Sequence, residues 1–202
     1  MGTTLLFDEG GRYIGNDGKN DHKTYVIKTT QQEFDSEVNS AGISRKEAKN
    51  TKKFIKDNSG NSSAFSLNSI AYKNSVELFG YAEDRMTMLK SIGDNGRGGM
   101  SPSNNREYGG TYKNGTVVLA KPGDISNSSI GASIVLPFGA PTFHSHPSGS
   151  DGSTNYRQAP SREDILVSGN NLHYVFAMSE KVVYIYNNKG VIASIPFKSF
   201  VK

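Results

Sequence analysis

The chain contains no cysteine among its 202 residues, so its fold uses no disulfide and a cysteine-ligated zinc is excluded. It has no apolar run long enough to span a membrane. The basic segment followed by an apolar one that marks a signal peptide is also missing. The formal net charge is only +4, and the lysines are scattered rather than gathered in stripes. These absences argue against both membrane and nucleic-acid partners.

Histidine is also scarce, but two of the four, His144 and His146, stand one residue apart after the apolar run IVLPFGAPTF. In a strand, residues i and i+2 point to the same face, about 6.5–7 Å apart. Two imidazoles at that separation can converge on one metal ion. Pro147 follows, and it lacks the N–H that would continue a strand ladder. The ordinary alternative is a pair of histidines at an exposed strand end.

A Gly/Ser-rich segment comes next, and then Pro160-Ser161 opens a predicted helix with carboxylates at Glu163 and Asp164. A carboxylate from this helix can return to the strand end as a third ligand. Two nitrogens and one carboxylate leave an open position on a tetrahedral ion, as in catalytic zinc sites. The alternative is a simple capping box, because Ser161 and Asp164 have the spacing of one.

Together, His144-Ser145-His146-Pro147 and Ser161-Arg162-Glu163-Asp164 resemble the signature of the JAB/MPN (JAMM) metalloprotease family. That signature is an upstream Glu, then His-x-His-Pro, then Ser-x-x-Asp. The resemblance covers about the C-terminal half of the chain, and the segment between the last two pieces is longer here than in compact members. The resemblance implies an α/β fold, a mixed β-sheet flanked by helices. It also implies a zinc ion (Zn2+) held by His144, His146 and Asp164.

The resemblance further implies a catalytic glutamate. Glu107 is the best candidate because a glycine follows it three positions on, as in the family. In the implied mechanism Glu107 accepts a proton from the water that zinc activates, and Ser161 donates a hydrogen bond to the oxyanion. Without the downstream motif, Glu107 would be an ordinary strand-edge carboxylate. Glu77 and Glu83 are weaker candidates, since they belong to a predicted helix with an apolar stripe.

The pattern predicts an N-terminal extension of hairpin and helices at residues 1–92 and a metallohydrolase core at residues 93–202. In the extension we predict a strand at Thr24–Thr29 and a helical region from Gln31 to Asp57, in which Ser44 caps the segment 45–57. A second helix is predicted to carry the apolar stripe Val76, Leu78, Phe79, Ala82, Met86 and Leu89. In the core we predict a hairpin of 107–112 and 116–120 around Asn114-Gly115, with further strands at 133–136, 142–144, 172–178, 181–186 and 191–195. His22 is expected in an exposed turn and His173 packed within a strand.

The pattern FDEGGRYIGNDG…KTYVIKTT resembles the junction before C-terminal effector domains of large, repeat-containing bacterial secreted proteins. We therefore expect a zinc-dependent peptidase or isopeptidase that acts on a protein or peptide as a bacterial toxin domain. Such a domain is secreted or delivered within a larger protein and meets a cognate immunity protein. Two alternatives stay open. One is a JAB-fold protein-interaction module without catalysis, and the other is a metal-dependent hydrolase of peptidoglycan peptides or nucleic-acid phosphodiesters.

Overall fold

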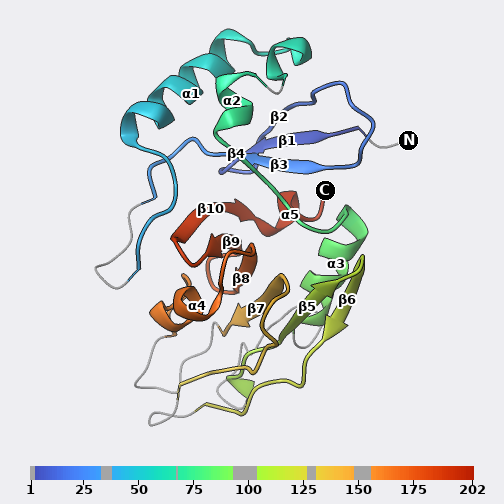
Figure 1. Ribbon diagram of the computed structural model, residues 1–202, viewed down its shortest axis with the longest axis vertical. Coiled ribbons are helices and arrows are strands. Elements are labelled where there is room, and N and C mark those ends of the chain that lie inside the picture. The colour runs from blue at the N-terminus through green and yellow to red at the C-terminus, as the bar shows by residue number, and fades with distance from the viewer. Residues whose placement is uncertain (1–2, 33–37, 67, 93–103, 127–130, 148–155) are drawn as a thin grey trace.

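The computed structural model describes residues 3–32, 38–66, 68–92, 104–126, 131–147 and 156–202, which form a mixed α/β fold with two mixed β-sheets (Figure 1). The smaller sheet has the order β2 (Tyr13–Gly15), β1 (Leu5–Asp8), β3 (Thr24–Ile27) and β4 (Ser75–Glu77). The larger sheet has the order β10 (Gly190–Pro196), β9 (Val182–Asn187), β8 (His173–Ala177), β7 (Thr142–His146), β5 (Gly109–Lys113) and β6 (Thr116–Leu119). The helices are α1 (Arg45–Asp57), α2 (Ile70–Lys73), α3 (Ala82–Ser91), α4 (Arg162–Val167) and α5 (Phe197–Phe200), with a 3-10 turn at Ser62–Phe65.

The first long helix, α1, begins where its cap predicts. The Ser44 hydroxyl accepts from the Glu47 amide, and the Glu47 carboxylate accepts from the Ser44 amide, which completes a capping box. The helical region does not extend back toward Gln31, because the described residues from Val38 to Ser44 are not helical. Ser40 instead forms an isolated parallel β-bridge with Val191 of β10, an edge strand of the larger sheet. That part of the prediction is wrong, and the segment 33–37 lies outside the described residues.

The apolar stripe predicted as one helix is divided between a strand and a helix. Helix α2 stops at Lys73, and Ser75–Glu77 then pairs antiparallel with Ile27–Tyr25 of β3. Only the second half of the stripe lies on α3. The helical prediction for Val76 is therefore wrong, because pairing with a buried strand outweighs the helical spacing of the apolar residues.

The larger sheet contains the predicted hairpin and places the two histidines at the end of an interior strand. Asn114 and Gly115 adopt φ values of +52° and +75°, as a two-residue hairpin turn requires. Strand β7 runs antiparallel to β5 and parallel to β8, so it lies between two neighbours and all five of its residues are buried. It extends two residues further than predicted and ends at His146, before Pro147.

Ser133–Leu136 was expected to be a strand, and the structure shows no regular secondary structure there, so that prediction is wrong. Ile134 and Leu136 are half-buried, whereas Val135 is 92% exposed. The segment passes close to Gly123, where a Cβ atom would lie 1.9 Å from the Ser133 carbonyl oxygen. The alternation of apolar residues here marks one wall of a pocket rather than a strand of the sheet.

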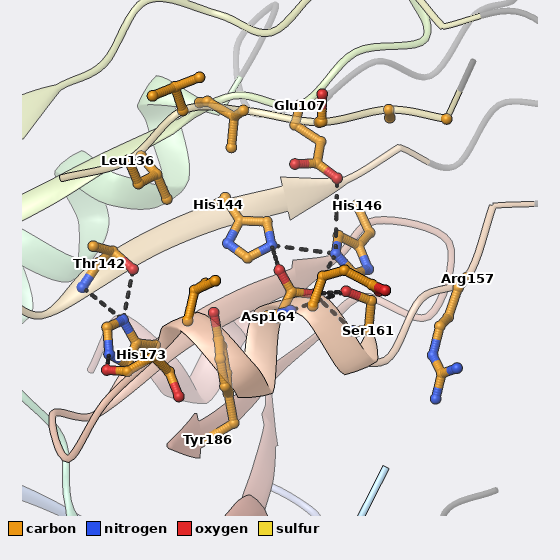
Figure 2. Close-up of a pocket in the computed structure, with 18 of the residues that line it drawn as sticks. Glu107, Leu136, Thr142, His144, His146, Arg157, Ser161, Asp164, His173 and Tyr186 are labelled. Carbon is orange, nitrogen blue, oxygen red and sulfur yellow. Dashed lines mark hydrogen bonds and ion pairs between the residues drawn. The ribbon is translucent and has the colours of Figure 1, made fainter. Parts of the chain in front are cut away.

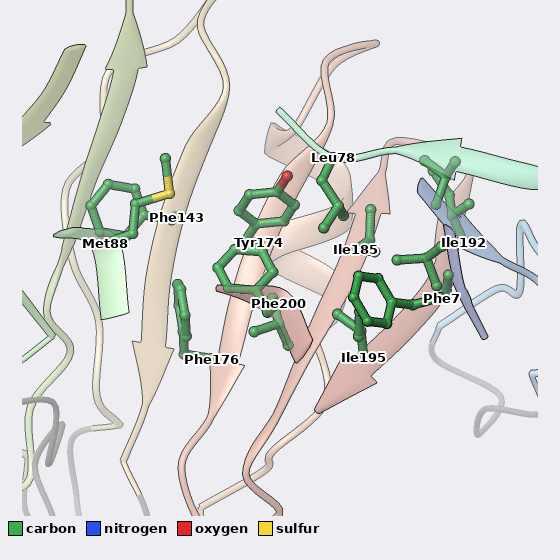
Figure 3. Close-up of a cluster of buried hydrophobic side chains, with 14 of the residues drawn as sticks. Phe7, Leu78, Met88, Phe143, Tyr174, Phe176, Ile185, Ile192, Ile195 and Phe200 are labelled. Carbon is green, nitrogen blue, oxygen red and sulfur yellow. The ribbon is translucent and has the colours of Figure 1, made fainter. Parts of the chain in front are cut away.

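One hydrophobic cluster joins the predicted extension to the predicted core (Figure 3). Phe7 and Leu78 from the N-terminal part meet Phe143, Ile185 and Ile192 from the larger sheet. Arg85 of α3 adds a buried polar connection. Its guanidinium donates to the Thr24 side chain at 2.7 Å and to the carbonyl oxygens of Phe200 and Lys202 at 2.5 and 2.6 Å. The N-terminal strands thus pack on one face of the larger sheet. On the other face, Ile165 of α4 packs with Val38 and with residues of β8, β9 and β10.

None of the helices in the described part of the chain combines the length and the apolar character that crossing a bilayer requires.

Candidate metal centre

The alternation of strand β7 separates its residues into two groups. Phe143 points into the main cluster, while His144 and His146 point to the opposite face, which α4 partly covers (Figures 1 and 2). Both imidazoles are buried, and their Nε2 atoms lie 3.2 Å apart. The Nδ1 atoms have no hydrogen-bond partner among the described residues. The two Nε2 atoms therefore face one shared point from neighbouring positions on one strand.

Asp164 reaches both imidazoles from the first turn of α4. Its Oδ1 lies 3.2 Å from His144 Nε2, and its Oδ2 lies 3.4 Å from His146 Nε2. The capping box holds this carboxylate in place, because Oδ2 accepts from the Ser161 amide at 2.6 Å and from the Ser161 hydroxyl at 2.8 Å. The same hydroxyl accepts from the Asp164 amide at 3.1 Å. The capping role and the site role of Ser161-x-x-Asp164 thus belong to one arrangement.

Glu107 comes to the site from the opposite side, two residues before β5 begins (Figure 2). It is buried, and its Oε1 lies 3.9 Å from His146 Nε2. The two glycines that open β5 have a packing role. A Cβ atom at Gly109 would lie 2.2 Å from the Phe143 carbonyl oxygen, and one at Gly110 would lie 2.2 Å from the Val118 carbonyl oxygen. They allow β5 to fit between its neighbours, which places Glu107 at the end of β7.

The buried group of Glu107, His144 and His146 can hold a metal ion, since one ligand atom from each lies within 4.8 Å of the others. A tetrahedral zinc ion with bonds of about 2.0–2.1 Å separates its ligand atoms by about 3.3 Å. The pair of Nε2 atoms and the Asp164 oxygens match this spacing at 3.2–3.4 Å. The Glu107 oxygen, at 3.9 Å, is less close. The Asp164 oxygens thus lie at the spacing of zinc ligands, and the Glu107 oxygen lies slightly beyond it.

The charges of the site depend on one another. Burial alone would lower the pKa of His144, but the carboxylates of Asp164 and Glu107 raise it to about 9. Burial alone would raise the pKa of Asp164, but His144 and His146 hold it well below its ordinary value. Burial raises the pKa of Glu107, although both histidines act against the shift. The site thus keeps Asp164 ionised and leaves Glu107 as the carboxyl group most ready to take a proton.

The other two histidines lie outside this group, as expected. His22 is exposed in a turn. His173 is buried; its Nε2 lies 2.6 Å from the Ser168 carbonyl oxygen, so Nε2 carries the proton, and Nδ1 accepts from the Thr142 hydroxyl at 2.6 Å. The weaker glutamate candidates also lie elsewhere. Glu77 pairs with Lys23, and Glu83 is exposed on α3.

A pocket of about 720 Å³ opens beside the metal-binding group. It is bounded by the segment 131–139, by β7 and by α4, and Tyr186 of β9 also lines it. Reasoning from the sequence did not identify Tyr186 or Leu136 as site residues. The alternation in 182–187 shows that Tyr186 shares a face with Tyr184, but which face points to the histidines depends on strand pairing.

Comparison of the chain with protein-family models, with curated proteins and with solved structures gave no match.

Proposed function

We propose that this protein is a zinc-dependent hydrolase that cleaves an amide bond, as a peptidase or isopeptidase. The observation that carries the proposal is the meeting of two buried imidazoles with two carboxylates from separate elements at one end of β7. Three of these groups suffice to hold an ion, and the fourth is then available for proton transfer. An inert structural site would use its carboxylates only as ligands.

In this proposal His144, His146 and Asp164 hold the zinc, and the donor spacing supports that choice. Zinc in such a site polarises a carbonyl and makes a water molecule nucleophilic near neutral pH. Glu107 is the proposed general base. Its carboxyl is buried, its pKa is raised by that burial, and it faces the same point as His146. These properties allow it to accept a proton and return it to the leaving nitrogen.

Ser161 is proposed first as a positioning residue. Its hydroxyl has one proton, which it donates to Asp164 Oδ2, and it accepts from the Asp164 amide. The oxyanion role that the family resemblance implies requires this hydroxyl to turn away from the carboxylate. The hydrogen bond from the Asp164 amide to Ser161 Oγ can persist when the hydroxyl proton rotates, because the oxygen is the acceptor in that bond.

The proposed setting is a toxin domain of a bacterial secreted protein, with a protein or peptide as substrate and an immunity protein as inhibitor. The support is the resemblance of the N-terminal sequence to the junction of such effectors.

Metal content and hydrolysis measured on the same set of variants test the proposal. We expect about one zinc per chain in the wild type by mass spectrometry, and loss of that zinc in His146→Ala and Asp164→Ala. Glu107→Gln should keep the zinc and lose hydrolysis of peptides or isopeptide conjugates. His22→Ala, which removes an exposed histidine, is the matched control and should behave as the wild type.

Five outcomes would contradict the proposal or part of it. Hydrolysis that survives a chelator, or full activity in His146→Ala, would contradict a role for the metal. Loss of zinc in Glu107→Gln with retention in Asp164→Ala would exchange the roles of the two carboxylates. Stoichiometric zinc with no hydrolysis of any amide substrate would favour the interaction module, and cleavage of a phosphodiester would favour the other hydrolase class.

A further inference from the structure

The pocket beside the candidate metal centre has two chemically different ends. In Figure 2, Leu136, Thr142 and His173 lie on the side of His144 that faces away from His146, whereas Arg157 lies beyond His146. The first end contains the apolar side chain of Leu136, and Val167 of α4 belongs to it because the next residue, Ser168, contacts His173. The second end is bounded by charged and polar groups. A ligand that extends through the site therefore meets apolar surface on the His144 side.

The apolar residues of this end are not used to stabilise the fold. Phe138 is 81% exposed and Val167 is 56% exposed, so neither is buried by the described part of the chain. Ile134 and Leu136 of the same wall are only half-buried. Exposed apolar residues gathered around a concave site are typical of ligand-binding pockets.

Both ring nitrogens of His173, at the His144 end of the pocket, already have partners. The Thr142 hydroxyl and the Ser168 carbonyl oxygen occupy the two ring nitrogens of His173 at 2.6 Å each. The Tyr186 ring stands edge-on to His144, with centroids 6.5 Å apart. Burying polar surface is usually unfavourable because it leaves polar atoms without hydrogen-bond partners. An apolar group that enters this end avoids that cost at His173, because both of its ring nitrogens keep their partners.

We propose that this end of the pocket binds a large aliphatic or aromatic side chain of the substrate, next to the bond that is hydrolysed. The inference rests on the proposed peptidase function and assigns its substrate class. Leu136, Val167 and Tyr186, which all line the pocket, are the proposed subsite residues. Substrates with a charged or very small residue at this position are bound less tightly, because they leave the apolar walls exposed to water.

Zinc-binding hydroxamic acids test the subsite without knowledge of the natural substrate. Acetohydroxamic acid and hexanohydroxamic acid carry the same metal-binding group and differ by four methylenes. We expect the longer compound to bind the zinc-loaded protein at least about tenfold more tightly in calorimetric titration, because burial of even part of the chain favours binding. Equal affinity of the two compounds for zinc-loaded protein would overturn the inference and leave the proposed function intact.

Two neighbouring residues of α4 provide a matched pair of variants. Val167→Asp places a carboxylate in the subsite, and Leu166→Asp places the same charge one residue earlier, at a 69% exposed position that does not line the pocket. We expect Val167→Asp to abolish most of the preference for the longer compound and Leu166→Asp to retain it. Equal loss in both variants would overturn the inference. A wild-type protein that takes up no zinc in a separate titration would overturn the proposed function, and the inference with it.

Discussion

The site makes one quantitative prediction about the protein when zinc is removed: its stability should fall as the pH rises from 6.5 to 9. The relevant group is His144, whose pKa is about 9 in the folded protein against 6.5 for an unperturbed histidine. A group with a raised pKa binds its proton more tightly in the folded state than in the unfolded state. Its contribution is fully present below pH 6.5 and is lost as the pH rises through 9.

The size of the effect follows from the shift. A difference of about 2.5 pKa units corresponds to about 3 kcal/mol of folding free energy. No discount for solvent applies, because His144 is buried. The lowered pKa of Asp164 contributes stability above its unfolded value near 3.8, and that contribution is constant across this range. The raised pKa of Glu107 acts in the same direction as that of His144. For a domain stable by about 5–15 kcal/mol, a loss of this size is large.

Urea unfolding in the presence of a chelator, at pH 6.5, 8 and 9, measures this loss directly. The midpoint should fall with each increase in pH, and His144→Ala should remove most of the dependence. Titration of the four histidines by NMR should place one imidazole with a pKa near 9 in the metal-free protein. An unchanged urea midpoint between pH 6.5 and 9, with no imidazole titrating near 9, would refute the ion pair that the geometry indicates. The zinc-loaded protein should show a weaker dependence, since the metal replaces the proton on His144.

The remaining predictions concern single residues. Glu107→Gln should keep zinc, measured by mass spectrometry, and reduce the hydrolysis rate by about 100-fold or more, the usual contribution of a general base; near-normal hydrolysis would remove Glu107 from the mechanism. Ser161→Ala should weaken zinc binding by about 10–100-fold in an indicator competition, because it releases the Asp164 carboxylate. It should also lower the unfolding free energy by about 1 kcal/mol through loss of the helix cap. Unchanged zinc affinity would contradict the positioning role of Ser161. Gly109→Ala should lower the melting temperature strongly, since its Cβ atom would lie 2.2 Å from the Phe143 carbonyl oxygen. A melting temperature equal to the wild type would show that β5 and β7 are not packed in this way.

Several parts of the fold could be predicted from the sequence because they depend on residues close together in the chain. Helix α1 begins after Ser44 and ends at Asp57 as predicted, since its capping box is complete within four residues. The turn at Asn114-Gly115 follows from the tolerance of these two residues for positive φ. That His144 and His146 share one face follows from the period of a strand. That a carboxylate near Ser161 can return to them was inferred from the pattern, and the choice of Asp164 came from the family resemblance.

The tertiary structure decided what these local patterns could not. Val76 lies in a strand because β3 offers it a partner, and Ser133–Leu136 lies outside the sheet although its composition suits a strand. The pKa of His144 depends on two carboxylates that lie 37 and 20 positions away from it in the chain. The sequence thus determined the local elements, because backbone geometry and capping act over a few residues. Strand pairing and packing between distant segments decide which face of the sheet meets α4 and how near Glu107 comes to the histidines. They also form the apolar pocket beside the histidines, so only the assembled fold determines these features.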